Sequence, residues 1–122
     1  MAKLLVVENE FVVASELERI LDEAGHRVIG LAPDTAAAVR LAEQERPDLA
    51  IVDLKLAVNL DGLKTAAIIA ERFGSRIVIS TGYMDRVIDE ASIRVHPCAV
   101  LRKPYTKEAV LAAVEKCLAP SR

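Results

Sequence analysis

The stretch LLVVENE, residues 4–10, runs four aliphatic residues directly into two carboxylates separated by an amide. A continuous aliphatic run is typical of a strand covered on both faces, because a strand with one wet face alternates apolar and polar residues. Similar runs recur along the chain. They are LLVV (4–7), VIGL (28–31), LAIV (49–52), IVI (77–79) and AVL (99–101). The pattern predicts five buried parallel strands.

Segments of helical length separate these runs. The first has an apolar face that ends before Gly25, a natural helix stop. That face consists of Val13, Leu17, Ile20, Leu21 and Ala24. Asp34, Asp61 and Thr106 can cap three further helices, and a weaker helix is expected at about 84–93. Alternating strands and helices with right-handed crossovers predict an α/β fold, a doubly wound five-stranded parallel sheet with helices on both faces.

Composition excludes several classes of partner. The chain has 122 residues, which is one domain (1–122), and only four follow Leu118, so no output domain is expected. The net charge is -2 and the Lys and Arg residues are scattered, which argues against nucleic acid and anionic membrane as partners. Only 3% of the residues are aromatic and none is Trp, so there is little to stack on nucleic acid bases. The apolar run near the N-terminus is too short for a signal peptide or a spanning helix. These features predict a cytoplasmic protein.

Cys98 and Cys117 are too few for a disulfide framework and lack metal-ligand spacing. We therefore expect two small buried hydrophobic side chains. His26 and His96 have no neighbouring ligands in the sequence and are expected at the surface.

Polar residues follow the predicted strands at the edge where doubly wound sheets place functional residues. Glu8 and Asn9 follow the first strand, Asp53 the third, Thr81 the fourth and Lys103 the fifth. Carboxylates facing each other are costly unless a hard cation joins them, and Mg²⁺ favours one or two carboxylates together with phosphate oxygens. The set suits phosphoryl transfer onto Asp53, with the metal and Lys103 neutralising the oxygens.

In these positions the chain resembles the receiver domain of two-component response regulators, from Lys3 to about Leu118. The motifs are the acids of LLVVENE, Asp53 in LAIVDLKL, the DG pair at residues 61–62, Thr81 in ISTGY, and Lys103 in LRKPY. ISTGY is also similar to the FATGY signature of one receiver subgroup. The resemblance implies a flavodoxin-like sheet of strand order 2-1-3-4-5.

The resemblance also implies residue roles. Asp53 would accept a phosphoryl group from a histidine kinase or histidine phosphotransfer protein, and Lys103 and Thr81 would bind its oxygens. Glu8, Asn9, Asp53 and the backbone carbonyl of Lys55 would hold Mg²⁺. The domain would signal in trans rather than act as an enzyme, and could form a homodimer through its last two helices.

Asn9 departs from the family pattern, which usually has a metal-binding Asp there. One unit charge about 4 Å from the ion is worth ~4 kcal/mol at an effective dielectric near 20. Waters and Glu8 would recover part of it, so we expect Mg²⁺ affinity lowered roughly ten- to a thousandfold. The alternative is a pseudo-receiver, a protein interaction module that works without phosphorylation.

Two further expectations concern the switch and docking. Val100 replaces the aromatic residue that often moves in family members, which leaves Tyr83 as the candidate switch residue. The segment 57–60 makes the loop after Asp53 longer than is usual in the family. By the resemblance, a kinase would dock on residues of the first helix and the loop after the last strand. These are Val12, Val13, Ser15, Glu16, Pro104 and Tyr105.

Two other protein classes fit less well. Haloacid-dehalogenase-type phosphatases need a second acid two residues after the nucleophile, where this chain has Lys55. Nucleotide-binding modules need a glycine-rich turn after the first strand, where this chain has residues 8–10, ENE.

Overall fold

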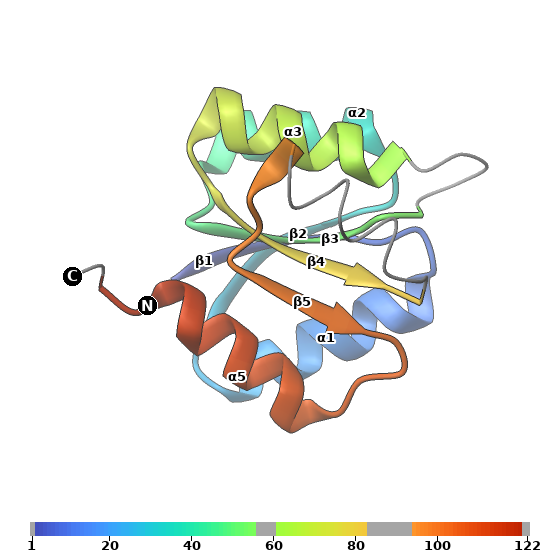
Figure 1. The fold of residues 1–122 in the computed structure, drawn as a ribbon, viewed down its shortest axis with the longest axis vertical. Helices are drawn as coiled ribbons and strands as arrows, with labels where there is room; N and C mark the ends of the chain where they lie inside the picture. Colours follow the sequence, from blue (N-terminus) through green and yellow to red (C-terminus); the bar gives the residue numbers. More distant parts are fainter. Residues whose placement is uncertain (1, 56–60, 83–93, 121–122) are drawn as a thin grey trace.

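The computed structural model describes residues 2–55, 61–82 and 94–120. Its strands form one parallel sheet of order β2-β1-β3-β4-β5 (Figure 1). They are β1 (Lys3–Val7), β2 (Arg27–Ala32), β3 (Leu49–Asp53), β4 (Arg76–Thr81) and β5 (Ala99–Arg102). Both the predicted fold class and the strand order are confirmed.

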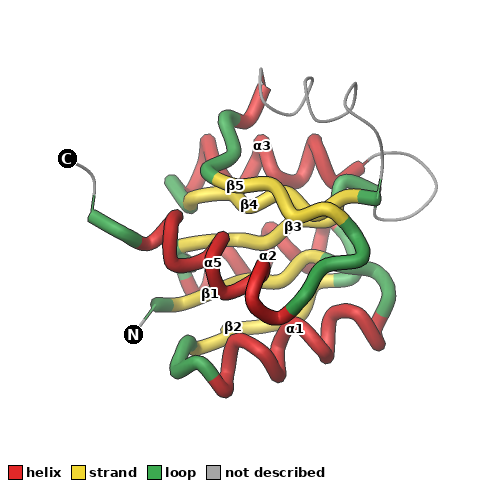
Figure 2. The backbone as a smooth tube through the Cα atoms, turned by 60° about the horizontal axis from the view of Figure 1, so that its bottom comes forward, coloured by secondary structure: helices red, strands yellow, loops and turns green. Residues whose placement is uncertain are grey.

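Helices cover both faces of the sheet. They are α1 (Phe11–Glu23), α2 (Thr35–Glu45), α3 (Asp61–Phe73) and α5 (Lys107–Leu118). Helices α1 and α5 pack on one face, and α2 and α3 pack on the other (Figures 1 and 2).

Two of the three predicted helix caps are confirmed. The Asp34 carboxylate accepts the Ala37 N–H at 2.9 Å, and the Thr106 hydroxyl accepts the Ala109 N–H at 3.0 Å. These bonds satisfy N–H groups that have no partner within the helix. Asp61 is instead the first residue of α3, where its charge complements the helix dipole.

The continuous apolar runs are explained by two cores on opposite faces of the sheet. In β1, Leu5 and Val7 point toward α2 and α3, whereas Leu4 and Val6 point toward α1 and α5. Successive strand residues face opposite ways, so a sheet covered on both sides needs apolar residues at every position.

The predicted apolar face of the first helix is largely correct. The core residues of α1 are Ala14, Leu17, Ile20 and Leu21. Val13 is only half-buried and Ala24 is the exposed C-cap, because the helix ends at Glu23. In α5 the buried residues are Val110, Ala113, Val114 and Cys117.

Some expectations fall on residues that the structure does not describe. The helix at about 84–93, Tyr83 and the loop 57–60 lie outside the described residues. A switch through Tyr83 and a dimer through the last two helices therefore stay predictions. Within the described ranges, no helix combines the length and apolar character needed to cross a bilayer.

The interpretation of the cysteines as two separate hydrophobic residues is wrong. Cys98 and Cys117 form a disulfide, with their Cα atoms 5.6 Å apart. The bond can form because the start of β5 packs beside the last turn of α5, which brings together residues 19 positions apart. Cys117 is buried in the core between the sheet and α5, and Cys98 is half-buried.

Candidate functional site

The carboxyl ends of β1, β3 and β5 bring two acids and a lysine together. The Lys103 ammonium donates to Glu8 Oε1 at 3.0 Å and to Asp53 Oδ2 at 3.2 Å. Glu8 is 3% exposed and Asp53 is 5% exposed. Two buried carboxylates that would repel each other are therefore joined by one cation.

The second oxygen of each carboxylate is also held. Glu8 Oε2 accepts the N–H of Glu10 at 3.1 Å, and Asp53 Oδ1 accepts the N–H of Lys55 at 3.1 Å. The backbone N–H of Lys103 donates to the carbonyl of Thr81 at 2.8 Å, which ties the loop after β5 to the end of β4. Both carboxylates and the lysine are thus held in place by hydrogen bonds within the protein.

Burial sets the electrostatics of the site. Burial raises the pKa of Glu8 above its ordinary value, although the Glu10 N–H and Lys103 offset part of the effect. Burial opposes the charge of Lys103, but its hydrogen bond to Glu8 and the charge of Asp53 outweigh this, so the pKa of Lys103 is raised. Lys103 is therefore a fixed cation at neutral pH.

Gly62 explains the DG pair at the start of α3. A Cβ atom added there would lie 1.9 Å from the Asp53 carbonyl oxygen and 2.6 Å from Leu54 Cα. The Gly62 N–H donates to the Leu54 carbonyl at 3.2 Å. Because helix α3 begins directly against the backbone of Asp53 and Leu54 at the end of β3, only glycine fits at this position.

Thr81 and Asn9 occupy the other predicted positions at this edge. Thr81 ends β4 and is buried, and Asn9 follows Glu8 in an exposed loop. Val100, in place of the family's aromatic residue, is half-buried and packs against the core on the α2 and α3 side.

The donors at this edge fit Mg²⁺ in kind. Glu8, Asn9, Asp53 and the Lys55 carbonyl offer hard oxygen ligands, which Mg²⁺ prefers. No group of three or more His, Cys, Asp or Glu side chains suited to a metal occurs among the described residues. Because Asn9 stands in place of an acid, the site has two carboxylates, Glu8 and Asp53, and one negative charge fewer than a site with an acid at position 9.

A largely apolar groove of about 470 Å³ lies beside Lys103. Its lining brings together all the predicted docking residues except Ser15. The lining residues are Val12, Val13, Glu16, Lys103, Pro104 and Tyr105. Phe11 and Val12, at the start of α1, are 75% and 80% exposed.

Phe11 was not singled out from the sequence as an exposed aromatic residue beside the docking residues, because helical periodicity selects only residues that are buried. Its signal in the sequence is an aromatic side chain directly after residues 8–10, ENE, in a chain with 3% aromatic residues.

Comparisons with known proteins show which family this chain is similar to. The family model for the response regulator receiver domain matches residues 4–115. The transcriptional regulatory protein PdtaR of Mycobacterium tuberculosis is 34% identical over 120 residues, which cover 98% of this chain and 57% of PdtaR. The phyllosphere-induced regulator PhyR of Methylorubrum extorquens is 30% identical over 117 residues, covering 95% of this chain and 43% of PhyR.

A solved structure is similar over nearly the whole chain. The signal receiver domain of a modulated diguanylate cyclase from Desulfovibrio desulfuricans G20 matches with a TM-score of 0.88 and 31% identity, covering 97% of this chain and 94% of that one. By contrast, the chain spans about half the length of the two curated relatives named above.

Proposed function

This chain belongs to the response regulator receiver domain family, and we propose that its Asp53 accepts a phosphoryl group from a histidine kinase or histidine phosphotransfer protein. Receiver domains are signalling domains rather than enzymes, and they interact with proteins of these two kinds. The observation that carries the proposal is the Lys103 ammonium, which contacts both Asp53 and Glu8. It places a fixed cation beside the carboxylate that would receive the negatively charged group.

The proposed step is an in-line displacement at phosphorus. An oxygen of the Asp53 carboxylate forms a bond to phosphorus, the P–N bond to the donor imidazole breaks, and its electron pair returns to the imidazole nitrogen. The product is an acyl phosphate on Asp53. The Lys55 N–H, bound to Asp53 Oδ1, orients the carboxylate for attack.

Two further groups would support this step. Glu8, Asn9, Asp53 and the Lys55 carbonyl would hold Mg²⁺, which supplies positive charge against the phosphoryl oxygens when bound. The Thr81 hydroxyl would donate to one of those oxygens. Because the Thr81 carbonyl accepts the Lys103 N–H, a shift of Thr81 would be transmitted to the loop after β5.

The groove beside Lys103 supports docking of the donor protein at α1 and the loop after β5. Its lining is mainly apolar, and Lys103 lies in it, so a helix seated there would bring its histidine close to Asp53. We further propose that residues 1–122 act as a single receiver domain in the cytoplasm, signalling in trans.

One observation favours a second candidate, a pseudo-receiver that binds partners without phosphorylation. Lys103 already bonds both carboxylates, and Asn9 adds no charge. This contact gives each carboxylate a cationic partner from the protein itself, which suits a domain that works without phosphorylation.

Intact mass spectrometry after incubation with phosphoramidate separates the two candidates. We expect a gain of one phosphoryl group that requires Mg²⁺ and is absent in Asp53→Ala. Asp22→Ala, which removes an exposed acid of α1, should behave as wild type. No gain at any Mg²⁺ concentration would favour the pseudo-receiver.

A further inference from the structure

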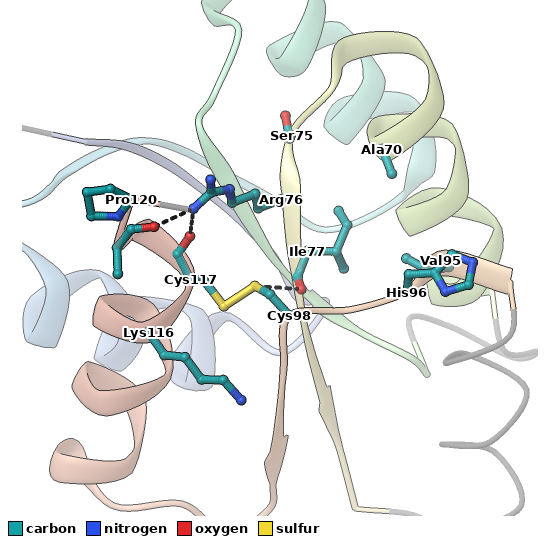
Figure 3. Close-up of a pocket in the computed structure, with 11 residues that line it drawn as sticks. Ala70, Ser75, Arg76, Ile77, Val95, His96, Cys98, Lys116, Cys117 and Pro120 are labelled. Atoms are coloured by element: carbon teal, nitrogen blue, oxygen red, sulfur yellow. Dashed lines mark hydrogen bonds between the residues drawn. A yellow bond between two sulfur atoms is a disulfide. The ribbon is translucent and has the colours of Figure 1, made fainter. Parts of the chain in front are cut away.

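The disulfide lies at the end of the sheet opposite Asp53 and Lys103. Cys98 directly precedes β5, and Lys103 directly follows it. The Cys98 N–H donates to the Ile77 carbonyl at 2.9 Å, which anchors this residue to β4. The bond to Cys117 therefore ties the last turn of α5 to the start of β5 (Figure 3).

A groove of about 500 Å³ opens beside the two sulfur atoms. Arg76 and Lys116 flank the disulfide in Figure 3, and His96 also lines the groove. None of the described residues in the lining is an acid. The groove therefore favours anionic ligands.

Arg76 also supports the cysteine at the end of α5. Its Nη1 donates to the Cys117 carbonyl and, at 3.3 Å, to the Ala119 carbonyl. A helix C-terminus disfavours a nearby negative charge, and a guanidinium bound to its carbonyls offsets this effect. A thiolate that forms on Cys117 therefore has a cation nearby.

Both redox states are compatible with the surrounding packing. Cys98 Sγ lies 3.4 Å from the Ile77 carbonyl oxygen, so a reduced Cys98 thiol has an acceptor in place. Cys117 is 2% exposed among aliphatic side chains, where a reduced thiol acts as a small hydrophobic group. The surroundings of both sulfur atoms therefore suit the reduced thiols as well as the disulfide.

We propose that Cys98–Cys117 is a reversible redox site that exchanges with an anionic low-molecular-weight thiol of the glutathione class. A thiolate of the small molecule attacks Cys98 Sγ, the more accessible sulfur, and the S–S bond breaks. The electron pair goes to Cys117 Sγ, which takes a proton from solvent. A second small thiolate then attacks the small-molecule sulfur of the mixed disulfide, which releases the oxidised small-molecule disulfide and the Cys98 thiolate. The Cys98 thiolate takes a proton from solvent.

Reduction would release the last turn of α5 from β5 without removing any contact of Asp53. The proposal therefore goes beyond the proposed phosphoryl transfer and does not rest on it.

The test uses the folded full chain in buffers of varied ratios of reduced to oxidised glutathione. Circular dichroism monitors the fold during the exchange. Each sample is then unfolded in denaturant that contains excess iodoacetamide, so that the buried Cys117 thiol also reacts, and the free thiols are counted by intact mass. We expect two thiols to appear and disappear together, reversibly, with the fold retained. The Cys98→Ser variant should show one thiol at every ratio.

A charge-reversal variant tests the ligand class. Lys116→Glu should slow reduction by glutathione by roughly threefold or more while leaving reduction by neutral 2-mercaptoethanol unchanged. Lys107→Glu, at the other end of α5, should change neither rate. A disulfide that glutathione reduces only after unfolding would overturn the proposal, as would thiols that never oxidise in the folded protein. Equal rates for wild type and Lys116→Glu with glutathione would overturn the assignment of an anionic thiol.

Discussion

Replacing Lys103 with methionine removes the cation that joins Glu8 and Asp53 while keeping most of the side-chain volume. At N–O distances of 3.0 and 3.2 Å, each pair has a gross Coulomb energy of about 5 kcal/mol at an effective dielectric of 20. Desolvation of the ions cancels much of this energy, and breaking a buried pair typically costs about 3–5 kcal/mol. The Lys103 side chain is 25% exposed, so solvent screening lowers the expected loss to about 2.5 kcal/mol.

The loss should depend on pH with a definite sign. Burial raises the pKa of Glu8, and without Lys103 that pKa rises further. A group whose folded-state pKa is raised stabilises the protein at low pH, and this contribution is lost as the pH rises through that pKa. The gap in unfolding free energy between wild type and Lys103→Met should therefore narrow as the pH falls below neutral.

Urea denaturation at several pH values measures both effects. Lys103→Met should lower the urea midpoint by roughly 1–2 M at neutral pH, and Lys107→Met, an exposed control, should change it little. Adding Glu8→Gln to Lys103→Met should recover at least about 1 kcal/mol, because only Asp53 then stays buried with its charge. Unchanged stability of Lys103→Met at neutral pH would refute this account of the site.

The remaining predictions concern the helix start, the metal and docking. Gly62→Ala should destabilise the fold by about 3 kcal/mol in urea denaturation, because its Cβ would meet backbone atoms. Gly82→Ala should have little effect, because the nearest atom to its Cβ would be Lys103 Cβ at 3.9 Å. Equal effects of the two substitutions would contradict the close approach at Gly62. Asn9→Asp should raise Mg²⁺ affinity by roughly ten- to a thousandfold in calorimetric titration, and no change would remove Asn9 from the metal site. Val13→Asp should impair phosphoryl transfer from a cognate kinase but not from phosphoramidate, with Ala36→Asp on α2 as the control; equal loss with both donors would refute docking in the groove.

The strands could be predicted because they are buried on both faces. Runs such as LLVV and LAIV lack the alternation of apolar and polar residues that a half-exposed strand shows. The N-terminal caps Asp34 and Thr106 could likewise be predicted from the sequence. Strand order could not be obtained from alternation alone, since several orders satisfy right-handed crossovers. It came from the family resemblance.

The site residues could be named from sequence, but their pairing could not. The edge rule selects Glu8, Asp53 and Lys103 without showing that one ammonium contacts both carboxylates. Likewise, a separation of 19 residues between Cys98 and Cys117 shows no proximity until β5 and α5 are packed together. Pair contacts between distant segments depend on tertiary packing, which local patterns do not encode.

Locating the phosphoryl group tests the central claim most directly. The protein is treated with phosphoramidate and Mg²⁺, the acyl phosphate is reduced with borohydride to homoserine, and peptides are mapped by mass spectrometry. We predict homoserine at position 53 alone, and only when both reagents are present. Its absence, or its presence at another aspartate, would contradict the assignment of Asp53 as the phosphoryl acceptor.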